Sequence, residues 1–354
     1  MRDRSPSAVG ASWLAWAALT LAGAFSALPQ VGQASTAGAL GTTATWAEDW
    51  FAHNAMMVMM GAAGNIGATV ASPKDQPWLF KLVPTLERAK RLHTGALDVE
   101  ALVHAGIKVA ILPKADRAQQ AQLAMAGIKA SVLGFDDFDG LQKCVWRTAT
   151  LVGTTLARQR AQAYQQALQA SLKRPMPPAG AGQRKPRLLH IASLRPLRVD
   201  GCGTILAQWT QAAGATTAAQ GVCGNRQSVT PEQVLAWAPD IIILAANAGP
   251  EEWLAQDPVL SRLAAVRHGH VWRNPAGLFL WDRYGPELLL QLSWARMVVE
   301  AETHPIPGEA REAAHEKVAQ AMMVETRAFY SRFYGIALSK GEAWRIVHAQ
   351  PPQP

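Results

Sequence analysis

A run of about thirty residues, from Leu141 to Leu172, has the apolar spacing of an α-helix and contains no proline. Its apolar residues recur every three or four positions, and Gly153 is the only glycine within it. At a rise of 1.5 Å per residue, such a run would form a rod of roughly 45 Å. The sequence therefore predicts one long, stiff helix that connects the parts of the chain on either side.

The segments before and after this run resemble each other. Residues 98–112 align without a gap on residues 230–244, so that Val109–Leu112 falls on Ile241–Leu244. In each copy a helical segment leads into four consecutive apolar residues, which is typical of a strand buried on both faces. The predicted fold class is therefore α/β, with two Rossmann-like α/β lobes joined by a single long α-helix.

Composition and turn signals predict how the chain is divided. Within the first lobe, the pattern indicates a helix from Trp46 to about Met60 and a loop from Lys74 to Pro84. The predicted parts are a signal peptide (1–34), an N-terminal α/β lobe (46–140), a bridging helix (141–172), a proline- and glycine-rich linker (173–186) and a C-terminal α/β lobe (187–348).

The N-terminus has the features of an export signal. Arg2 and Arg4 precede an apolar stretch, residues 13–28, that is short for a membrane span. Small residues follow, and Gly32 and Ala34 suit a cleavage site after Ala34. The alternative is an uncleaved membrane anchor. We expect a cleaved, exported protein of the bacterial periplasm.

The charge of the chain is basic, with a formal net charge of +8 at pH 7. Lysines and arginines are scattered, with no run of five, so the charge does not indicate a nucleic-acid partner. Of the three cysteines, Cys202 and Cys223 share a glycine-rich region and could form a disulfide in an oxidising compartment. Two buried thiols or a soft-metal site are the alternatives, and Cys144 is interpreted as a packed core thiol.

Polar and aromatic residues follow the predicted strands, at the sheet edge where α/β lobes place their ligands. Arginine beside tryptophan suits a planar anionic ligand, through charge-assisted hydrogen bonds and stacking. The alternatives are that these arginines are solvated surface cations and that His53 is a structural group rather than a ligand. The candidates on this ground are His53, Trp78, Lys114, Arg195, Trp281, Arg283 and Tyr284.

With these segments in view, the chain resembles the periplasmic substrate-binding proteins of ABC importers for iron–siderophore complexes, cobalamin and haem. The resemblance extends from about Trp46 to Val347. It is most specific in five segments, 97–106, 126–133, 230–244, 263–277 and 280–295.

The resemblance implies a site, a partner and a mode of action. The segment Trp50–Asn54 matches the first pocket loop of the family, which adds Asn54 to the ligand candidates and supports His53, the one candidate for direct metal contact. The partners that it implies are a metal-chelate ligand and an inner-membrane permease with its ATPase. The docking carboxylates that it implies are Glu251 and Glu252 on the second lobe and Asp116 on the first.

The function that we expect from this resemblance is capture of a ferric siderophore or related chelate by a monomeric protein without a resident cofactor. Cobalamin, haem, a free metal ion or an oxyanion are alternatives within the same class. A chelatase-like enzyme is the alternative from a different class. The sequence contains no nucleophile elbow, no phosphate-binding glycine loop and no HExxH motif, so we expect no enzyme activity.

Overall fold

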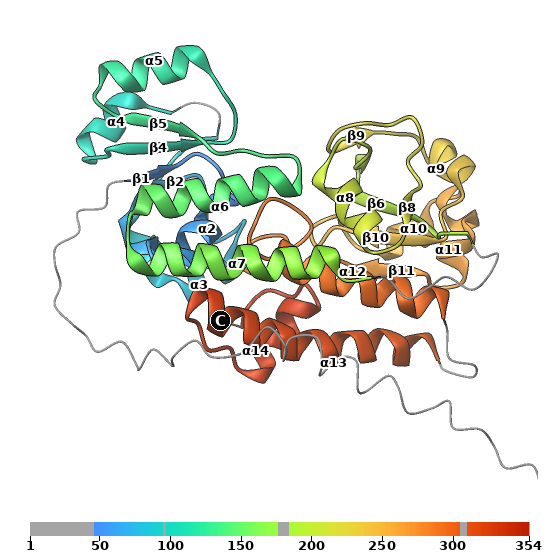
Figure 1. Ribbon diagram of the computed structural model, residues 1–354. Helices are drawn as coiled ribbons and strands as arrows, with labels where there is room; N and C mark the ends of the chain where they lie inside the picture. Colours follow the sequence, from blue (N-terminus) through green and yellow to red (C-terminus); the bar gives the residue numbers. More distant parts are fainter. Residues whose placement is uncertain (1–45, 95–96, 176–183, 305–309, 354) are drawn as a thin grey trace, which may run out of the picture. The chain divides into compact units, whose positions relative to one another are not determined.

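The computed structural model describes residues 46–94, 97–175, 184–304 and 310–353 (Figure 1). The predicted signal peptide and the middle of the predicted linker lie outside these residues. The described chain contains two β-sheets, one on each side of the helical run in sequence. The predicted two-lobed α/β class is therefore confirmed.

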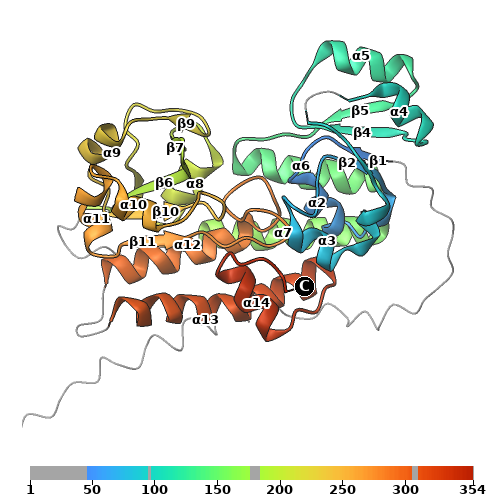
Figure 2. The ribbon, with the colours of Figure 1, turned by 180° about the vertical axis from the view of Figure 1, so that it is seen from behind.

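The first sheet is entirely parallel, in the order β3-β2-β1-β4-β5. Its strands are β1 (Trp46–Glu48), β2 (Ile66–Thr69), β3 (Lys90–Arg91), β4 (Val109–Leu112) and β5 (Lys129–Val132). Figures 1 and 2 show α4 (Val99–His104) and α5 (Arg117–Met125) on one side of this sheet. On the other side lie α2 (His53–Met59) and α6 (Phe138–Val152).

The alternation of side chains along β4 explains why helices cover both faces of the first sheet. Ala110 and Leu112 belong to the apolar cluster formed with α4 and α5. Ile111, between them, belongs to the cluster formed with α2 and α6. All three residues are fully buried, which a strand with consecutive apolar residues requires.

The second sheet is mixed, in the order β11-β10-β6-β7-β9, with β8 also paired to β6. Strands β6, β8, β10 and β11 are parallel, and β7 pairs antiparallel with β6 and β9. The strands are β6 (Arg187–Leu194), β7 (Leu197–Val199), β8 (Thr216–Thr217), β9 (Gln227–Ser228), β10 (Ile241–Leu244) and β11 (Val271–Arg273).

The second sheet also has helices on both faces. Ile242 and Leu244 of β10 pack in the cluster that includes α9 (Pro231–Trp237), α10 (Glu252–Gln256) and α11 (Ala264–Arg267). Ile241 and Ile243 belong instead to the cluster that includes α8 (Ile205–Ala212) and α12 (Leu288–Thr303). The predicted repeat is thereby confirmed, because α4–β4 and α9–β10 hold equivalent places in their sheets.

The predicted single rod over residues 141–172 is wrong. Helix α6 ends at Gly153, whose φ of 76° is in the left-handed region that glycine adopts without steric cost. A second helix, α7 (Thr155–Lys173), begins after Thr154, whose side chain accepts a hydrogen bond from the amide of Ala157.

Helix α7 then reverses along α6. The side chain of Gln165 donates to the backbone carbonyl of Gln142 at 3.3 Å, and Gln169 donates to the side-chain oxygen of Gln142 at 3.2 Å. Because these partners lie on opposite sides of Gly153 in sequence, the two helices form an antiparallel hairpin. Only α7 leads toward the second sheet.

The start of the first lobe also differs from the prediction. The segment predicted as one helix, from Trp46 to about Met60, contains β1 and then α2, and the 3₁₀ turn η1 (Ala63–Asn65) and β2 follow it. The segment predicted as a loop contains α3 (Pro77–Leu82), which is followed by the 3₁₀ turn η2 (Pro84–Arg88). Strand β1 has only three residues, too few for a period to be recognised in the sequence.

The C-terminal segment packs against both parts of the chain. It consists of α13 (Arg311–Phe329), the π-helical turn η4 (Tyr330–Tyr334) and α14 (Lys340–Val347); a further 3₁₀ turn, η3 (Leu260–Arg262), precedes α11. Helix α13 contacts α12, and the indole nitrogen of Trp78 in α3 donates to the carbonyl of Gln350 at 2.8 Å. In the described ranges, no helix is both long and apolar enough to cross a membrane.

Candidate functional site

Three aromatic side chains from distant parts of the sequence meet in one cluster, which we call the aromatic cluster: Trp50, Phe135 and Tyr284. Trp50 follows β1, and Phe135 follows β5, so both stand at the carboxyl edge of the first sheet. Tyr284 comes from the loop between β11 and α12. The ring centroids lie 5.5 to 5.8 Å apart, with tilted or edge-on planes. Such contacts are favourable, and two of the rings keep part of their surface exposed.

The backbone around Tyr284 is held in an uncommon conformation. Tyr284 has a φ of 60°, and Arg226 has a φ of 54°, although neither is glycine. Between them, the side-chain amide of Asn225 donates to the Tyr284 phenol oxygen at 2.7 Å. Positive φ at bulky residues costs free energy and tends to occur at functional sites. The pair Asn225–Tyr284 is therefore the centre of the candidate site.

Behind Tyr284 lies a buried network of four charged groups, which we call the ion network: His190, Asp200, Asp282 and Arg283. Nδ1 of His190 lies 2.8 Å from Oδ2 of Asp200, and Nε2 lies 3.0 Å from Oδ2 of Asp282. The Arg283 guanidinium reaches the same two oxygens, at 3.0 and 3.2 Å. Two cations and two anions thus alternate, which is the arrangement that allows charges to be buried.

The pKa values of the ion network favour its charged form. Burial alone would lower the pKa of His190, but its hydrogen bonds to the two aspartates outweigh burial and raise it. Burial would raise the pKa values of Asp200 and Asp282, but His190 and Arg283 hold both below the usual range. Arg283 was predicted to contact ligand. Its side chain is buried instead, and its ion pairs with Asp200 and Asp282 hold the backbone next to Tyr284 in place.

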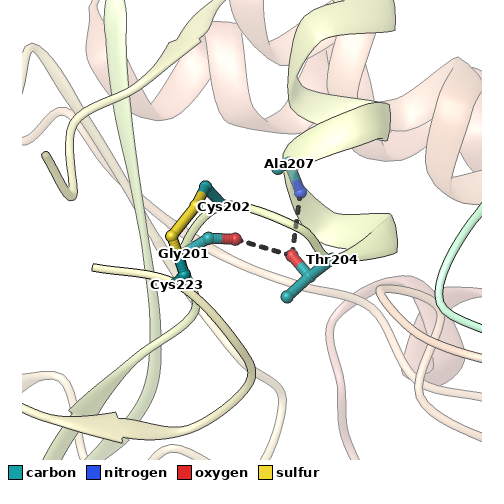
Figure 3. Close-up of a disulfide and its surroundings, with 5 residues drawn as sticks. All are labelled: Gly201, Cys202, Thr204, Ala207 and Cys223. Carbon is teal, nitrogen blue, oxygen red and sulfur yellow. Dashed lines mark hydrogen bonds between the residues drawn. A yellow bond between two sulfur atoms is a disulfide. The ribbon is translucent and has the colours of Figure 1, made fainter. Parts of the chain in front are cut away.

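The segment that carries Asn225 is tied to the rest of the second lobe by a disulfide between Cys202 and Cys223 (Figure 3). Beside it, the Thr204 hydroxyl donates to the Gly201 carbonyl at 2.8 Å and accepts from the Ala207 amide, so that Thr204 caps the start of α8 (Figure 3). Of the three sequence alternatives for this cysteine pair, the structure has the disulfide.

The ion network is joined to the same segment. The other carboxylate oxygen of Asp200 accepts from the backbone amide of Arg226 at 2.8 Å. The disulfide and this hydrogen bond hold the segment on either side of Asn225, and so position its side chain against Tyr284.

His53 is a buried structural residue. Its Nε2 lies 2.9 Å from the Thr148 hydroxyl, which itself donates to the carbonyl of Cys144, so Nε2 must be the donor. Its Nδ1 lies 2.8 Å from the Glu48 carboxylate. Burial alone would lower the pKa of His53, but Glu48 raises it to about 10. Both ring nitrogens are thus engaged within the protein, which agrees with the structural interpretation and not with a metal ligand.

Asn54 and Trp78 are also buried in internal contacts. The Asn54 amide donates to the carbonyl of Phe51, in the turn before α2, at 3.2 Å, and its oxygen accepts from the Thr69 hydroxyl at 2.8 Å. Trp78 is bonded to the carbonyl of Gln350, as described above. Within the described chain, Asn54 thus touches the aromatic cluster only through the backbone carbonyl of Trp50, at 3.5 Å, and not through a ring.

The remaining candidates lie in three different surroundings. Lys114 is exposed after β4. Arg195 is exposed, with its guanidinium 4.3 Å above the ring of Trp253. Trp281 is fully buried. Of the eight predicted ligand residues, Tyr284 is thus part of the aromatic cluster, and Arg283 precedes it in the chain. The buried ring of His53 stacks on Trp50 from within the first lobe, with the ring centroids 6.2 Å apart.

Six residues of the site were not among the eight ligand candidates from the sequence: Trp50, Phe135, Asn225, His190, Asp200 and Asp282. Phe135 carries a signal in the sequence, because it comes shortly after β5, at the carboxyl edge of a parallel sheet. Trp50 comes shortly after β1, which is too short to be recognised from the sequence. His190 interrupts an apolar strand, and a buried histidine in such a run calls for a charged partner. Asn225 gave no signal beyond its position in a glycine-rich segment.

The predicted docking carboxylates lie at equivalent places in the two lobes. Asp116 precedes α5, after β4, and its side chain accepts from the Gln119 amide at 3.1 Å. Glu251 and Glu252 begin α10, after β10. All three are exposed. Partial burial raises the pKa of Glu251, against the effect of the nearby Arg273.

The chain was compared with protein families, with curated proteins and with solved structures. A family model described as periplasmic binding protein matches residues 59–277. No curated protein matches the chain.

Among solved structures, a periplasmic solute binding protein from Veillonella parvula superposes with a TM-score of 0.69 at 18% identity, covering 86% of this chain and 92% of that one. An ABC transporter solute binding protein from Sulfurospirillum deleyianum gives 0.66 at 16% identity, covering 86% and 94%. The molybdate periplasmic binding protein MolA of Haemophilus influenzae, bound to molybdate, gives 0.64 at 17% identity, covering 84% and 94%. At these identities the likeness shows the fold.

Proposed function

Because this chain belongs to the periplasmic binding protein family, we propose that it captures a metal chelate, a ferric siderophore, and delivers it to an ABC importer. Membership of this family implies a periplasmic location. The family binds solutes for transport, so the proposed activity is capture and not catalysis.

The aromatic cluster is the observation that supports this proposal most. Trp50 and Tyr284 present partly exposed rings, one from each lobe, to the same place. Ring faces of this kind bind the flat aromatic or conjugated groups of a catecholate or related chelator. Arg226, exposed next to Asn225, and Lys114, exposed at the carboxyl edge of the first sheet, are cations that suit an anionic complex.

An oxyanion is the second candidate ligand. The observation that favours it is the structural similarity to the molybdate binding protein of Haemophilus influenzae. A small oxyanion would need hydrogen-bond donors more than ring faces. Removal of a ring should therefore affect the binding of a chelate much more than the binding of molybdate. Cobalamin, haem and a free metal ion remain further candidate ligands, and their binding should be measured in the same way.

The proposed partner is an inner-membrane permease with its ATPase. Asp116 and the pair Glu251–Glu252 stand after equivalent strands of the two sheets and are free of ion pairs in the described chain. Exposed carboxylates on each lobe suit docking on two basic patches of a permease. We propose that the protein acts as a monomer.

The proposed mode of binding involves little movement of one lobe against the other. The side chain of Gln76 in the first lobe donates to the Leu278 carbonyl in the second at 3.1 Å. The Trp78–Gln350 bond ties the first lobe to the C-terminal segment. A large compaction on ligand binding, measured by small-angle scattering, would contradict this part of the proposal.

The test of function is a fluorescence titration of the protein without residues 1–34. The panel consists of ferric enterobactin, ferrichrome, cyanocobalamin, hemin, molybdate and nickel chloride. Saturable quenching by a ferric siderophore, weakened at least about tenfold by Tyr284→Ala, is the expected result. Saturable binding of molybdate alone would support the oxyanion. No binding to any member would remove support for both.

A further inference from the structure

An open cavity of about 690 Å³ lies at the amino edge of the second sheet, and we call it the amino-edge cavity. It is found where three parallel strands begin, because Arg187 starts β6, Ile241 starts β10 and His270 directly precedes β11. The residues of the aromatic cluster do not line it. Its volume is that of a site for a small organic molecule.

The two carboxylates in the wall of this cavity already have their donors. Asp240 accepts from both terminal nitrogens of Arg184, at 2.6 and 2.8 Å, and from the backbone amide of Arg187 at 2.7 Å. Glu302 accepts from the indole nitrogen of Trp272 at 2.6 Å and from the guanidinium of the first residue of α13 at 2.9 Å. Neither carboxylate is left to balance a further cation.

Two arginines in the same wall have no partner. Arg262 of η3 and Arg267 of α11 are exposed, and neither guanidinium makes a hydrogen bond or an ion pair within the described chain. Arginines near helix ends often bind the free carbonyls there, as Arg187 does with the carbonyl of Ala238 at 2.7 Å. Arg262 and Arg267 have no such role, so their charges are open to a ligand in the cavity.

The charges of the wall do not cancel. Four arginines line the amino-edge cavity, against two carboxylates. Because the carboxylates are bound to other donors, the excess positive charge lies with Arg262 and Arg267. A cavity with one sign of charge in its wall concentrates ligands of the opposite sign.

The other side of the wall is apolar. It includes the side chains of Leu235, Pro239, Ile241 and Leu263, of which Leu235 is partly exposed. Ile241 and Leu263 are each only 1% exposed, so they form a fixed surface at the base of the sheet. The cavity therefore combines two unpaired guanidinium groups with an apolar surface.

These properties select a class of ligand. A phosphate monoester carries nearly two negative charges at neutral pH, and it can accept paired hydrogen bonds from each of two guanidinium groups. A carboxylate has one charge and would leave one arginine unpaired. The volume is far larger than the roughly 30 Å³ of one water molecule, so the cavity also has space for an organic group on its apolar side.

We propose that the amino-edge cavity binds an organic phosphate monoester, with the phosphate between Arg262 and Arg267 and the organic group on Leu235 and Leu263. This site is separate from the aromatic cluster and does not depend on the proposed function. Both arginines are exposed and unpaired, so their replacement should leave the fold intact.

The first experiment is a calorimetric titration of the protein with phenyl phosphate, which has a phosphate dianion on an apolar ring. We expect saturable binding with a dissociation constant of about 1 mM or below. Inorganic phosphate lacks the ring, and benzoate lacks the second charge, so each should bind at least about tenfold more weakly. No saturation by phenyl phosphate up to about 10 mM would overturn the proposal. Equal affinity for inorganic phosphate or for benzoate would also overturn it.

The second experiment places the bound molecule. Arg262→Gln and Arg267→Gln should each weaken the binding of phenyl phosphate about tenfold. Arg158→Gln, at an exposed arginine of α7, is the matched control and should bind like the wild type. Equal losses in all three variants would mean that only the net charge matters, and would overturn the site. Tyr284→Ala should also bind like the wild type, because a loss there would place phenyl phosphate at the aromatic cluster instead.

A third variant tests the apolar side of the cavity. Leu235→Ala should weaken the binding of phenyl phosphate and leave that of inorganic phosphate unchanged, because only the ring contacts this side chain. A general distortion of the cavity would weaken both. Unchanged binding of phenyl phosphate in Leu235→Ala would contradict the placement of the organic group.

Discussion

The side-chain amide of Asn225 donates a hydrogen bond to the phenol oxygen of Tyr284 at 2.7 Å. These two residues come from separate loops of the second lobe, and each loop is fixed by its own set of contacts. A disulfide holds the first, and the buried carboxylate of Glu287, which accepts from two backbone amides of the loop, holds the second. The ion network joins them through Asp200 and Arg283. The second lobe therefore builds a rigid support under one aromatic side chain that faces Trp50 and Phe135.

Removal of the Tyr284 ring should weaken ligand binding without unfolding the protein. Tyr284→Ala loses the contacts with Trp50 and Phe135, and we expect the dissociation constant to rise at least about tenfold. Tyr284→Phe keeps the ring and should have a much smaller effect. Trp146→Ala, at an exposed tryptophan of α6, is the control and should leave the affinity unchanged. Equal losses in Tyr284→Ala and Trp146→Ala would refute this placement of the site.

Removal of one anion from the ion network should destabilise the fold strongly. Asp282→Asn leaves His190 and Arg283 with one carboxylate between them, and we expect the free energy of unfolding in urea to fall by about 3 kcal/mol. Asp98→Asn is the matched control, because asparagine caps α4 as well as aspartate does. A loss below about 1 kcal/mol for Asp282→Asn would mean that the network is not a buried charged unit.

Replacing Gly153 or Gly341 by alanine should change the free energy of unfolding in opposite directions, because Gly153 ends α6 whereas Gly341 lies within α14. Gly153→Ala should destabilise the protein by about 1 kcal/mol, because its φ of 76° strains any residue with a Cβ. Gly341→Ala, within α14 and with open space around it, should stabilise the protein by up to about 1 kcal/mol. If residues 141–172 formed one rod instead, Gly153→Ala would stabilise it too. Urea denaturation of both variants distinguishes these outcomes.

The disulfide should stabilise the second lobe and the ligand site. The double variant Cys202→Ser with Cys223→Ser is expected to lose about 3 kcal/mol of unfolding free energy. It should also bind ligand more weakly, because the segment that carries Asn225 is released. Dithiothreitol should lower the stability of the wild type and leave the double variant unchanged. A reductant effect of equal size on both proteins would show that the loss does not come from this bond.

The pH dependence of stability should report Glu287. Its pKa is raised from 4.5 to about 7, so the folded protein favours the protonated form. The stability that this group contributes is fully present below pH 4.5 and is lost as the pH rises through 7, by roughly 3 kcal/mol in total. The difference in unfolding free energy between wild type and Glu287→Gln should therefore change in favour of the variant over this range. A difference independent of pH would contradict the raised pKa.

The strands and the lobes could be predicted because burial on both faces leaves a direct mark on the sequence. Val109–Leu112 and Ile241–Leu244 are runs of apolar residues, and they became β4 and β10 without change of bounds. The hairpin between α6 and α7 was missed because both helices keep the same apolar period. The only sequence signal for the turn is Gly153 followed by the capping residue Thr154, and this signal is weak beside a helical pattern of about thirty residues.

The site was harder to predict than the fold, for a physical reason. Arg283 looks like a ligand residue because it stands in a loop beside Trp281 and Tyr284. Whether such an arginine faces solvent or two aspartates depends on which segments meet in space, and Asp200 lies far away in sequence. The same holds for His53, whose partner Thr148 comes from α6. Phe135, which comes shortly after a strand with a clear apolar pattern, could have been predicted, whereas Trp50 comes after a strand of only three residues.

The most direct test of the account is a crystal structure of the protein with the member of the ligand panel that quenches its fluorescence. We expect a ferric siderophore in contact with the rings of Trp50 and Tyr284, with Asn225 still hydrogen-bonded to Tyr284. We also expect Arg283 to stay buried between Asp200 and Asp282. A ligand bound elsewhere, with the aromatic cluster unchanged and unoccupied, would contradict it.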